Sequence, residues 1–315
     1  MNGALQRIAD DLSDAGLAVQ RDVSVAHMTT YRVGGSVGVF VDVADAGQLV
    51  ALAAVTARHD AETLVIGNGS NLLVADGGAA VVAVRLGPGF EQIEIDATTV
   101  IAGGAARLPV VARRSVAAGL TGFEWAVGVP GSIGGAVRMN AGGHGSDMAK
   151  SVASVRVLDL RTGQDETMSG SACEFGYRRS RFGSSSVVLS ASLALSAAAD
   201  PAASERELSE IVQWRRAHQP GGQNAGSVFT NPPGESAGRL IDTAGCKGLR
   251  VGSAQVSDKH ANFIQADPAG SADDVAALMG EVVQRVRSVH GVTLHPETVM
   301  VGFDAGVLER AGVLR

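Results

Sequence analysis

The sequence predicts an α+β fold in which helices and strands are intermixed along the chain. Apolar residues recur with the 3.6-residue period of a helix in some windows and run as short strand-like blocks in others. The chain has 315 residues, 45% hydrophobic and 18% charged, so it can bury a sizeable core. Two glycine-rich segments, residues 67–72 and 128–145, interrupt this pattern. Such segments are typical of backbone that approaches a ligand closely.

The first predicted element is a short helix near the N-terminus. Leu5, Ile8, Ala9 and Leu12 recur at the i, i+3, i+4 and i+7 positions, and Gly16 follows as a stop signal. We expect this helix to pack on the outside of the elements that follow it.

A strand–helix–strand unit is predicted next. Residues 37–43 are strand-like, residues 48–58 form an alanine-rich helical window, and residues 63–66 are strand-like again. The elements predicted after it are strands at residues 80–85, 93–95 and 99–102 and a helix at residues 108–118.

A domain boundary is predicted near residues 190–204, where alanine and serine dominate and Pro201 ends the run. Ser204 and Glu207 then form a capping-box pattern, which predicts a helix from there to about residue 217.

A longer helix is predicted after Ser271, which forms a second capping pattern with Asp274, and Gly291 is expected to end it. Strands near residues 262–265 and 299–301 would complete a compact C-terminal α+β domain. The apolar face of the helix is expected to contain Val275, Leu278, Met279, Val282, Val286 and Val289.

Composition and charge argue against several classes of partner. The formal net charge is −6 and the basic residues are not gathered into a stripe, so we expect no nucleic-acid partner. Cys173 and Cys246 lack metal-ligand spacing, as do the histidines, so no metal site is expected. No apolar stretch reaches the ~20 residues of a membrane span and no signal peptide is evident, so a cytoplasmic protein is expected.

The glycine-rich segments together predict a dinucleotide site of an unusual kind. Residues 67–71 follow a predicted strand, but Leu72 stands where a Rossmann fingerprint would have its third glycine, and no P-loop pattern occurs. Taken alone, this segment is more typical of an ordinary tight turn. Combined with residues 128–145, it indicates a cradle of two loops large enough for a dinucleotide.

Several motifs resemble those of the UDP-N-acetylenolpyruvoylglucosamine reductase family, in that family's order. The similarity spans roughly residues 28–303. One branch of the family carries a folded insertion with a tyrosine-bearing lid. The stretch between Phe182 and Ser204 is too short for it, so this chain resembles the shorter, second type. The motifs that carry the resemblance are residues 30–35, 67–73, 119–124, 128–145, 175–182, 224–232, 245–248, 256–263 and 294–297.

The resemblance implies an FAD-binding fold of the PCMH or vanillyl-alcohol-oxidase-like kind, with two subdomains, followed by a smaller α+β substrate domain. The implied reaction reduces UDP-N-acetylglucosamine enolpyruvate to UDP-N-acetylmuramate, with hydride passing from NADPH through FAD, for peptidoglycan synthesis. A monomer is expected. The implied domains are a lead-in at residues 1–29, an FAD-binding domain at residues 30–195 with lobes at about 30–86 and 87–195, and a substrate domain at residues 204–315.

The resemblance also assigns three catalytic residues. Arg178 would hold the carboxylate and its enolate form, Ser227 would donate the proton, and Glu297 would help position the substrate carboxyl group. From the residues alone these roles stay open. Arg178 is one of three nearby arginines, Ser227 fits an ordinary turn serine, and Glu297 fits a strand-end acid.

Further contacts are implied for the cofactor and the substrate. His144 and Thr230 depart from the family pattern, which leaves contacts near the flavin edge and the sugar nucleotide open. The substrate end would involve Tyr177, Asn231, Lys247 and Lys259. The flavin contacts would be Tyr31, Arg32, Gly67, Asn68, Gly69, Ser70, Asn71, Leu72, Gly128, Ser132, Gly134, Gly135, Asn140, Ala141 and Gly142.

Two other classes of function remain open from the sequence. A flavin-dependent oxidase of sugars or alcohols would share the cofactor fold, and a flavin-binding protein without turnover would share the cofactor alone. The C-terminal motifs argue against the oxidase, and the joint presence of Arg178, Ser227 and Glu297 argues against mere binding. A metal hydrolase has no ligand set.

Overall fold

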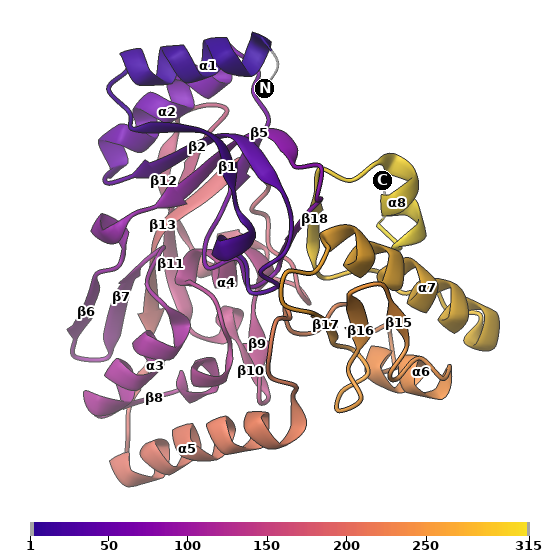
Figure 1. Ribbon diagram of the computed structural model, residues 1–315. Coiled ribbons are helices and arrows are strands. Elements are labelled where there is room, and N and C mark those ends of the chain that lie inside the picture. Colours follow the sequence, from indigo (N-terminus) through magenta and orange to yellow (C-terminus); the bar gives the residue numbers. More distant parts are fainter. Residues whose placement is uncertain (1–2, 314–315) are drawn as a thin grey trace. The chain divides into compact units, whose positions relative to one another are not determined.

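The computed structural model describes residues 3–313, which mix helices and strands as predicted (Figure 1). The chain forms two compact units, which are interleaved along the sequence. Unit 1 contains Met1–Arg21, Val39–Asn68 and Val81–Arg215, and unit 2 contains Asp22–Gly38, Gly69–Ala80 and Arg216–Arg315. This division differs from the consecutive ranges expected above, whose independence as folding domains stays a prediction.

The N-terminal elements form as predicted. Helix α1 (Gly3–Asp14) buries the four expected residues, Leu5, Ile8, Ala9 and Leu12, and contacts α2 (Ala46–Arg58). Asp45 caps α2, because its side chain accepts a hydrogen bond from the Gln48 N–H. A four-stranded sheet has the order β1-β2-β5-β3, with strands at Val19–Ser24, Ser36–Val43, Ala79–Leu86 and Thr63–Val65.

The predicted strand–helix–strand unit corresponds to β2, α2 and β3. Its two strands are not neighbours, since β5 lies between them and pairs in parallel with β3. Val82 and Val84 of β5 are buried in the same hydrophobic cluster as Leu49 and Leu52 of α2. The helix therefore covers this sheet with its apolar face.

Unit 1 also contains a five-stranded sheet of order β12-β11-β13-β7-β6, in which every neighbouring pair is antiparallel. Only its last two strands were predicted. Its core includes Val111, Phe123, Ile133, Val155 and Leu193. The strands are β6 (Ile93–Asp96), β7 (Thr99–Gly103), β11 (Val152–Asp159), β12 (Asp165–Ser169) and β13 (Ser186–Ala194).

Several shorter elements lie between or after the strands of this sheet in the sequence. They are α3 (Leu108–Ala117), β8 (Leu120–Thr121), the 3-10 turn η3 (Glu124–Gly128), α4 (Ile133–Met139), β9 (Gly142–Gly143), β10 (Ser146–Asp147) and β14 (Ser196–Ala197). Three further 3-10 turns of unit 1 are η2 (Pro88–Phe90), η4 (Met148–Lys150) and η5 (Gly170–Cys173).

Helix α5 (Pro201–His218) ends near the predicted residue 217 but begins before Ser204, so the prediction that Ser204 caps it is wrong. Asp200 provides an acceptor for the Ala202 N–H at 3.0 Å, and Pro201 suits the first turn because its nitrogen needs no partner there. Ser204 lies inside the helix instead, and its hydroxyl donates to the Glu124 carboxylate at 2.6 Å.

Unit 2 is built around α7 (Ala272–His290), which contacts α6 (Ala237–Thr243), α8 (Ala305–Arg310) and the sheet β15-β16-β17. The predicted caps are confirmed: Ser271 accepts from the Asp274 N–H, and Gly291 has a left-handed φ of 69°. Val289 is 58% exposed, so its place on the buried face is wrong. The remaining elements are β15 (Arg250–Val251), β16 (Ala254–Val256), β17 (Ile264–Ala266), the parallel pair β4 (Leu72–Val74) and β18 (Val299–Val301), and the 3-10 turn η1 (Ala26–Met28).

Candidate active site

The two glycine-rich segments come together in unit 1 at Gly67 and Ser132. Ser132 is buried, and a Cβ atom added at Gly67 would lie 2.8 Å from the Ser132 hydroxyl oxygen. Gly135 is exposed, and a Cβ atom there would meet nothing nearer than this hydroxyl, at 3.8 Å. Gly67 and Gly135 therefore leave bare backbone beside a serine hydroxyl. This surface fits a diphosphate, which binds backbone N–H groups.

Other glycines of these segments are required by the protein's own packing. A Cβ atom at Gly69 would lie 2.1 Å from the Met28 carbonyl oxygen, and one at Gly142 would lie 2.6 Å from the Ser146 carbonyl oxygen. At Gly134 a backbone carbonyl would be 3.1 Å away. The absence of side chains at these three positions is thus explained without a ligand.

Residues 128–145 form a short helix and a hairpin, so the expectation of a continuous loop is wrong. Ile133 and Val137 bury one face of α4. Strands β9 and β10 then pair across His144 and Gly145, whose φ values of 51° and 79° are both left-handed. A two-residue hairpin of type I′ requires this conformation at both positions.

Asn140 ends α4 in the left-handed conformation, with φ 41°, and is only 5% exposed. Its amide nitrogen donates to the Gly176 carbonyl oxygen at 3.0 Å and to the Asp147 carboxylate at 3.3 Å. Its side-chain oxygen accepts from the Ala149 N–H at 2.9 Å. The neighbouring Ala141 donates its N–H to α4 and accepts from the Met148 N–H. The Asn140 side chain therefore connects the end of α4 to the segments that contain Gly176, Asp147 and Ala149.

Arg178 lies in a tight turn formed by residues 176–179, which we call the Arg178 turn. Gly176 and Arg179 exchange both backbone hydrogen bonds, at 2.9 and 3.2 Å. Arg178 has a φ of 54°, a conformation that residues other than glycine, asparagine and aspartate rarely adopt. Its guanidinium donates to the Gly142 carbonyl oxygen at 3.2 Å and lies 5.6 Å from the ring centre of the exposed Tyr177.

The segments that carry Ser227 and Glu297 pair with each other in unit 2. The Glu297 N–H donates to the Val228 carbonyl oxygen at 2.7 Å, and Phe229 pairs with Pro296. The Ser227 hydroxyl, half-buried, forms no hydrogen bond with any of residues 3–313. The interpretation of Ser227 as a turn serine bonded to its own backbone therefore does not hold.

Asn71 links the first glycine-rich segment to Glu297 within unit 2. Its amide nitrogen donates to the Glu297 carbonyl oxygen at 2.9 Å, and its own carbonyl accepts from the Val299 N–H at 2.9 Å. The Asn71 side chain, expected to contact the flavin, is thus partly used to place the backbone of Glu297. Leu72, the next residue, begins β4 and is buried.

Tyr31 and Arg32 lie beside this segment in unit 2. Thr30 donates its N–H to the Gly69 carbonyl oxygen at 3.1 Å. Tyr31 is fully buried, which raises the pKa of its phenol. Its hydroxyl has no hydrogen-bond partner among residues 3–313, so a buried donor remains for a ligand. Arg32 is exposed, with a left-handed φ of 54°.

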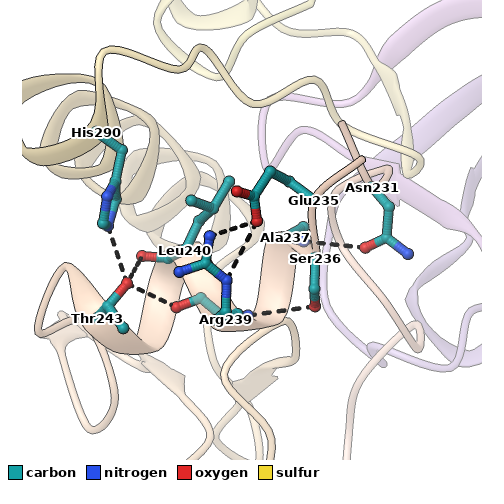
Figure 2. A network of polar contacts seen from close by, with 8 residues as sticks. All are labelled: Asn231, Glu235, Ser236, Ala237, Arg239, Leu240, Thr243 and His290. Atoms are coloured by element: carbon teal, nitrogen blue, oxygen red, sulfur yellow. Dashed lines mark hydrogen bonds and ion pairs between the residues drawn. The ribbon is translucent and has the colours of Figure 1, made fainter. Parts of the chain in front are cut away.

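The four residues expected at the substrate end are all exposed, and three of them form hydrogen bonds or ion pairs within unit 2. Figure 2 shows Asn231 at the first turn of α6, where its side-chain oxygen accepts from the Ala237 N–H at 3.0 Å. Lys247 pairs with Asp242 at 2.8 Å, and Lys259 donates to the Arg216 carbonyl oxygen at 2.6 Å. Tyr177, the fourth, is 60% exposed.

The two departures from the family pattern have local partners. His144 meets the Trp214 ring edge to face, with ring centres 5.2 Å apart. Burial and the nearby Arg215 lower the pKa of His144. Thr230 donates its hydroxyl and its N–H to the His295 carbonyl oxygen, at 3.2 and 3.0 Å. Both side chains therefore have defined packing in this chain.

Asn262 is a site residue that the sequence analysis did not single out. It is 4% exposed, accepts from the Phe229 N–H at 3.0 Å and donates to the Phe229 carbonyl oxygen at 2.8 Å. Its backbone carbonyl accepts from the Val228 N–H at 2.9 Å. An asparagine inside a predicted buried strand is the signal that would have indicated such a role.

Residues 3–313 contain neither a membrane-spanning helix nor a metal-binding cluster. No helix among them is long and apolar enough to cross a membrane. No group of three or more His, Cys, Asp or Glu side chains in this part of the chain is arranged to hold a metal ion.

Comparison with known protein families identifies both parts of the chain. Residues 37–169 match the FAD binding domain family. Residues 218–301 match the family described as UDP-N-acetylenolpyruvoylglucosamine reductase, C-terminal domain. These matches confirm the expected order of an FAD-binding part followed by a smaller C-terminal part.

Individual relatives cover nearly the whole chain. UDP-N-acetylenolpyruvoylglucosamine reductase 2 of Symbiobacterium thermophilum is 40% identical over 306 residues, which is 96% of this chain and 98% of that protein. The reductase of Heliobacterium modesticaldum is 41% identical over 90% of this chain and 91% of its own length.

A solved structure agrees with these relatives. The crystal structure of UDP-N-acetylenolpyruvylglucosamine reductase from Thermus caldophilus has a TM-score of 0.78 and 34% identity, covering 90% of this chain and 99% of that one. Since relatives about 40% identical match almost its full length, the chain belongs to the UDP-N-acetylenolpyruvoylglucosamine reductase family.

Proposed function

We propose that this chain reduces UDP-N-acetylglucosamine enolpyruvate to UDP-N-acetylmuramate, with NADPH as the reductant and FAD as the cofactor. This makes it a UDP-N-acetylmuramate dehydrogenase of peptidoglycan precursor synthesis. The observation that carries the proposal is family membership over almost the full length, together with the presence of Arg178, Ser227 and Glu297.

The proposed cofactor contacts combine bare backbone with a few polar side chains. These residues would hold FAD, which would supply the hydride-transfer chemistry between NADPH and the vinyl carbon of the substrate. Gly67, Ser132 and Gly135 support the diphosphate contact best, because the two glycines leave bare backbone beside the buried Ser132 hydroxyl. The buried hydroxyl of Tyr31 is a further donor. The other contacts proposed on the family pattern are Arg32, Asn68, Gly69, Ser70, Asn71, Leu72, Gly128, Gly134, Ala141 and Gly142, together with the backbone, but not the side chain, of Asn140.

Arg178 is proposed to hold the substrate carboxylate and the charge that develops on it. Hydride addition to the terminal carbon leaves negative charge on the neighbouring carbon, which delocalises into the carboxylate. A guanidinium is always charged and offers a planar pair of donors that matches a carboxylate. Stabilising developing charge is usually the largest catalytic contribution. Glu297 is proposed to help position the same carboxyl group.

Ser227 is proposed to donate the proton that completes the reaction. A serine hydroxyl is a weak acid, so it must be presented directly to a strongly basic carbon. Support comes from the pairing of its segment with that of Glu297, and from a hydroxyl that no other described residue engages. A hydroxyl already donating within the protein would have to break that bond first.

Asn231 is the best supported of the proposed substrate contacts. Its side-chain oxygen is held by α6, so its amide hydrogens remain to donate to an anionic group (Figure 2). Lys247 and Lys259 would each have to leave an existing contact to reach a ligand. Tyr177 is proposed from its place beside Arg178.

The remaining expectations are proposals about the whole protein. We propose a cytoplasmic monomer whose ligands are NADPH and the enolpyruvyl sugar nucleotide, and whose function involves neither nucleic acid nor a membrane. The net charge of −6 supports the absence of a nucleic-acid partner.

Anaerobic stopped-flow absorbance tests the proposal. The purified holoprotein is mixed first with NADPH and then with UDP-N-acetylglucosamine enolpyruvate, and the flavin band is followed. Bleaching followed by rapid recovery is the expected result, with UDP-N-acetylmuramate as the product. Bleaching without recovery would overturn the substrate assignment. No bleaching would favour a flavin oxidase or a binding protein, and oxygen-dependent turnover of sugars would then distinguish these two.

A further inference from the structure

Asn140 has no hydrogen-bonding capacity to spare for donation to a ligand. Both hydrogens of its amide have protein acceptors, the Gly176 carbonyl and the Asp147 carboxylate, and its oxygen accepts from Ala149. A primary amide carries only two hydrogens. At 5% exposure the side chain is also closed off from solvent. The Asn140 side chain therefore acts on the segments that it joins and not on a ligand.

One of those segments is the Arg178 turn. The Gly176 carbonyl oxygen accepts twice, from the Arg179 N–H across the turn and from the Asn140 amide. The Arg178 side chain in turn donates to the Gly142 carbonyl, two residues after Asn140. Ser180, just past the turn, donates its hydroxyl to the Arg138 carbonyl at 2.7 Å. The end of α4 and strand β9 thus hold both the backbone and the side chain of Arg178.

The turn needs this support because its conformation is unfavourable. A non-glycine residue in the left-handed region costs roughly 1 kcal/mol or more and persists only where its surroundings enforce it. Arg178 is in this region, at φ 54°. Strained residues of this kind cluster at functional sites, and a residue whose fork must meet a carboxylate tolerates little displacement.

We propose that Asn140 is a positioning residue for Arg178, which it holds by hydrogen bonding to the Gly176 carbonyl. This inference rests on the proposed function and replaces a direct flavin contact by the Asn140 side chain. Asn140 is suited to the position because asparagine tolerates the left-handed conformation at the end of α4 while still offering an amide. It acts on the substrate through Arg178 alone.

Two variants separate the amide from the backbone conformation. Asn140→Gly keeps the left-handed conformation accessible and removes all three hydrogen bonds. Asn140→Asp keeps an oxygen for the Ala149 N–H but cannot donate to Gly176 at neutral pH. Ala97→Gly is the matched control, because Ala97 is an exposed residue with a left-handed φ of 48° outside the proposed site.

The expected result is a selective loss in one half-reaction. A displacement of about 1 Å in a positioning contact can cost on the order of 100-fold in rate. We therefore expect Asn140→Gly and Asn140→Asp to slow flavin reoxidation by the enolpyruvyl substrate by roughly 10- to 100-fold. Flavin content and the rate of flavin reduction by NADPH should stay within about 3-fold of the parent protein.

A double-mutant cycle with Arg178→Ala tests whether the effect passes through Arg178. If it does, adding Asn140→Gly to Arg178→Ala should slow single-turnover reoxidation by less than about 3-fold further. Multiplicative effects of the two substitutions would overturn the proposal, as would a loss of FAD affinity in Asn140→Asp with reoxidation unchanged. Failure of the parent holoprotein to be reoxidised would instead overturn the proposed function, so the two failures are distinguishable.

Discussion

At the scale of residues, the Asn262 side chain holds both backbone groups of Phe229, two residues after the proposed proton donor Ser227. Arg178, Ser227 and Glu297 are proposed from motifs that keep the family's order. The side chains that place them were not predicted, since Asn262 contacts Phe229 from a position 33 residues away in the sequence. Such a contact depends on tertiary pairing that no local pattern encodes.

Ser227→Ala should separate the two half-reactions. Loss of a general acid typically costs about 10²- to 10⁴-fold, so reoxidation by the enolpyruvyl substrate should slow by that order. Reduction of the flavin by NADPH should change by less than about 2-fold, because the hydroxyl has no role in it. Stopped-flow absorbance measures both rates. Ser288→Ala, an exposed serine of α7, is the control, and an equal loss in both half-reactions would show that Ser227 is structural.

Glu124 should make the stability of unit 1 sensitive to acid. The residue is 3% exposed, and although burial by itself raises its pKa, hydrogen bonds from Ser204, Thr121 and the Gly122 N–H lower it overall from the ordinary value of 4.5. A lowered pKa in the folded state gives stability that is present above the unfolded-state pKa. That stability is lost as the pH falls through the lower, folded-state value.

Replacing Glu124 tests this directly. At pH 7, Glu124→Gln should lower the free energy of unfolding by roughly 1 to 2 kcal/mol, because charge-assisted hydrogen bonds become neutral ones. The difference from the parent protein should shrink as the pH falls below about 4. Urea unfolding midpoints between pH 7 and 3.5 measure it, with the exposed Glu94→Gln as control. If the difference in unfolding free energy between the two proteins did not change with pH, the lowered pKa of Glu124 would be contradicted.

At the scale of elements, locally encoded features were predicted and distant ones were not. Helices α1 and α7 match their expected ranges because the apolar period of each lies within its own sequence. The caps of α7, Ser271 and Gly291, also adjoin it directly in the sequence. The start of α5 was misplaced because Ser204 bonds to Glu124, 80 residues away, instead of capping the helix. Strands β11 and β13 were missed although Val155 and Val157 alternate in β11 and residues 187–189 of β13 form a short apolar run.

The N-terminus of α7 should depend on a residue far from it in the sequence. Asp76, just after β4, accepts from the Ala272 and Asp273 N–H groups at 2.9 and 3.1 Å and from the Ser271 hydroxyl. The Asp76 N–H donates to the Asp273 carboxylate at 3.2 Å. A carboxylate at this end also interacts favourably with the helix dipole.

Asp76→Ala should therefore destabilise the protein by about 1 to 3 kcal/mol, because two N–H groups of the first turn lose their acceptor. Ser271→Ala, which removes the local cap, should cost about 1 kcal/mol. Chemical unfolding followed by circular dichroism compares the two, with Asp304→Ala at the start of α8 as a control that makes no side-chain cap. An effect of Asp76→Ala no larger than that of the control would refute this role.

At the scale of the whole molecule, the chain is organised as two interleaved units rather than consecutive blocks. Composition and motif order predicted the α+β class and a smaller C-terminal part that follows the FAD-binding part. They did not predict that Asp22–Gly38 and Gly69–Ala80 belong to the same compact unit as the C-terminal residues. Sequence patterns reveal the local periodicity of helices and strands. They do not reveal that a segment early in the chain packs with residues near its end.

This organisation predicts that residues 204–315 do not fold on their own. In unit 2, β18 pairs with β4, and the hydrophobic cluster around α7 includes Tyr31, Val33 and Leu73. A fragment beginning at residue 204 lacks all of these. Each buried side chain is worth about 1.5 to 3 kcal/mol, so the three together match the 5 to 15 kcal/mol that stabilises a typical domain.

The fragment should consequently show no cooperative urea unfolding transition and poorly dispersed amide resonances. Joining residues 22–38 and 69–80 through flexible linkers to residues 216–315 should restore both properties, since it returns β4 and the missing core residues to the unit. Unfolding followed by circular dichroism compares the two proteins with the intact chain. A cooperative transition in the 204–315 fragment would mean instead that the C-terminal residues form a domain without the early segments.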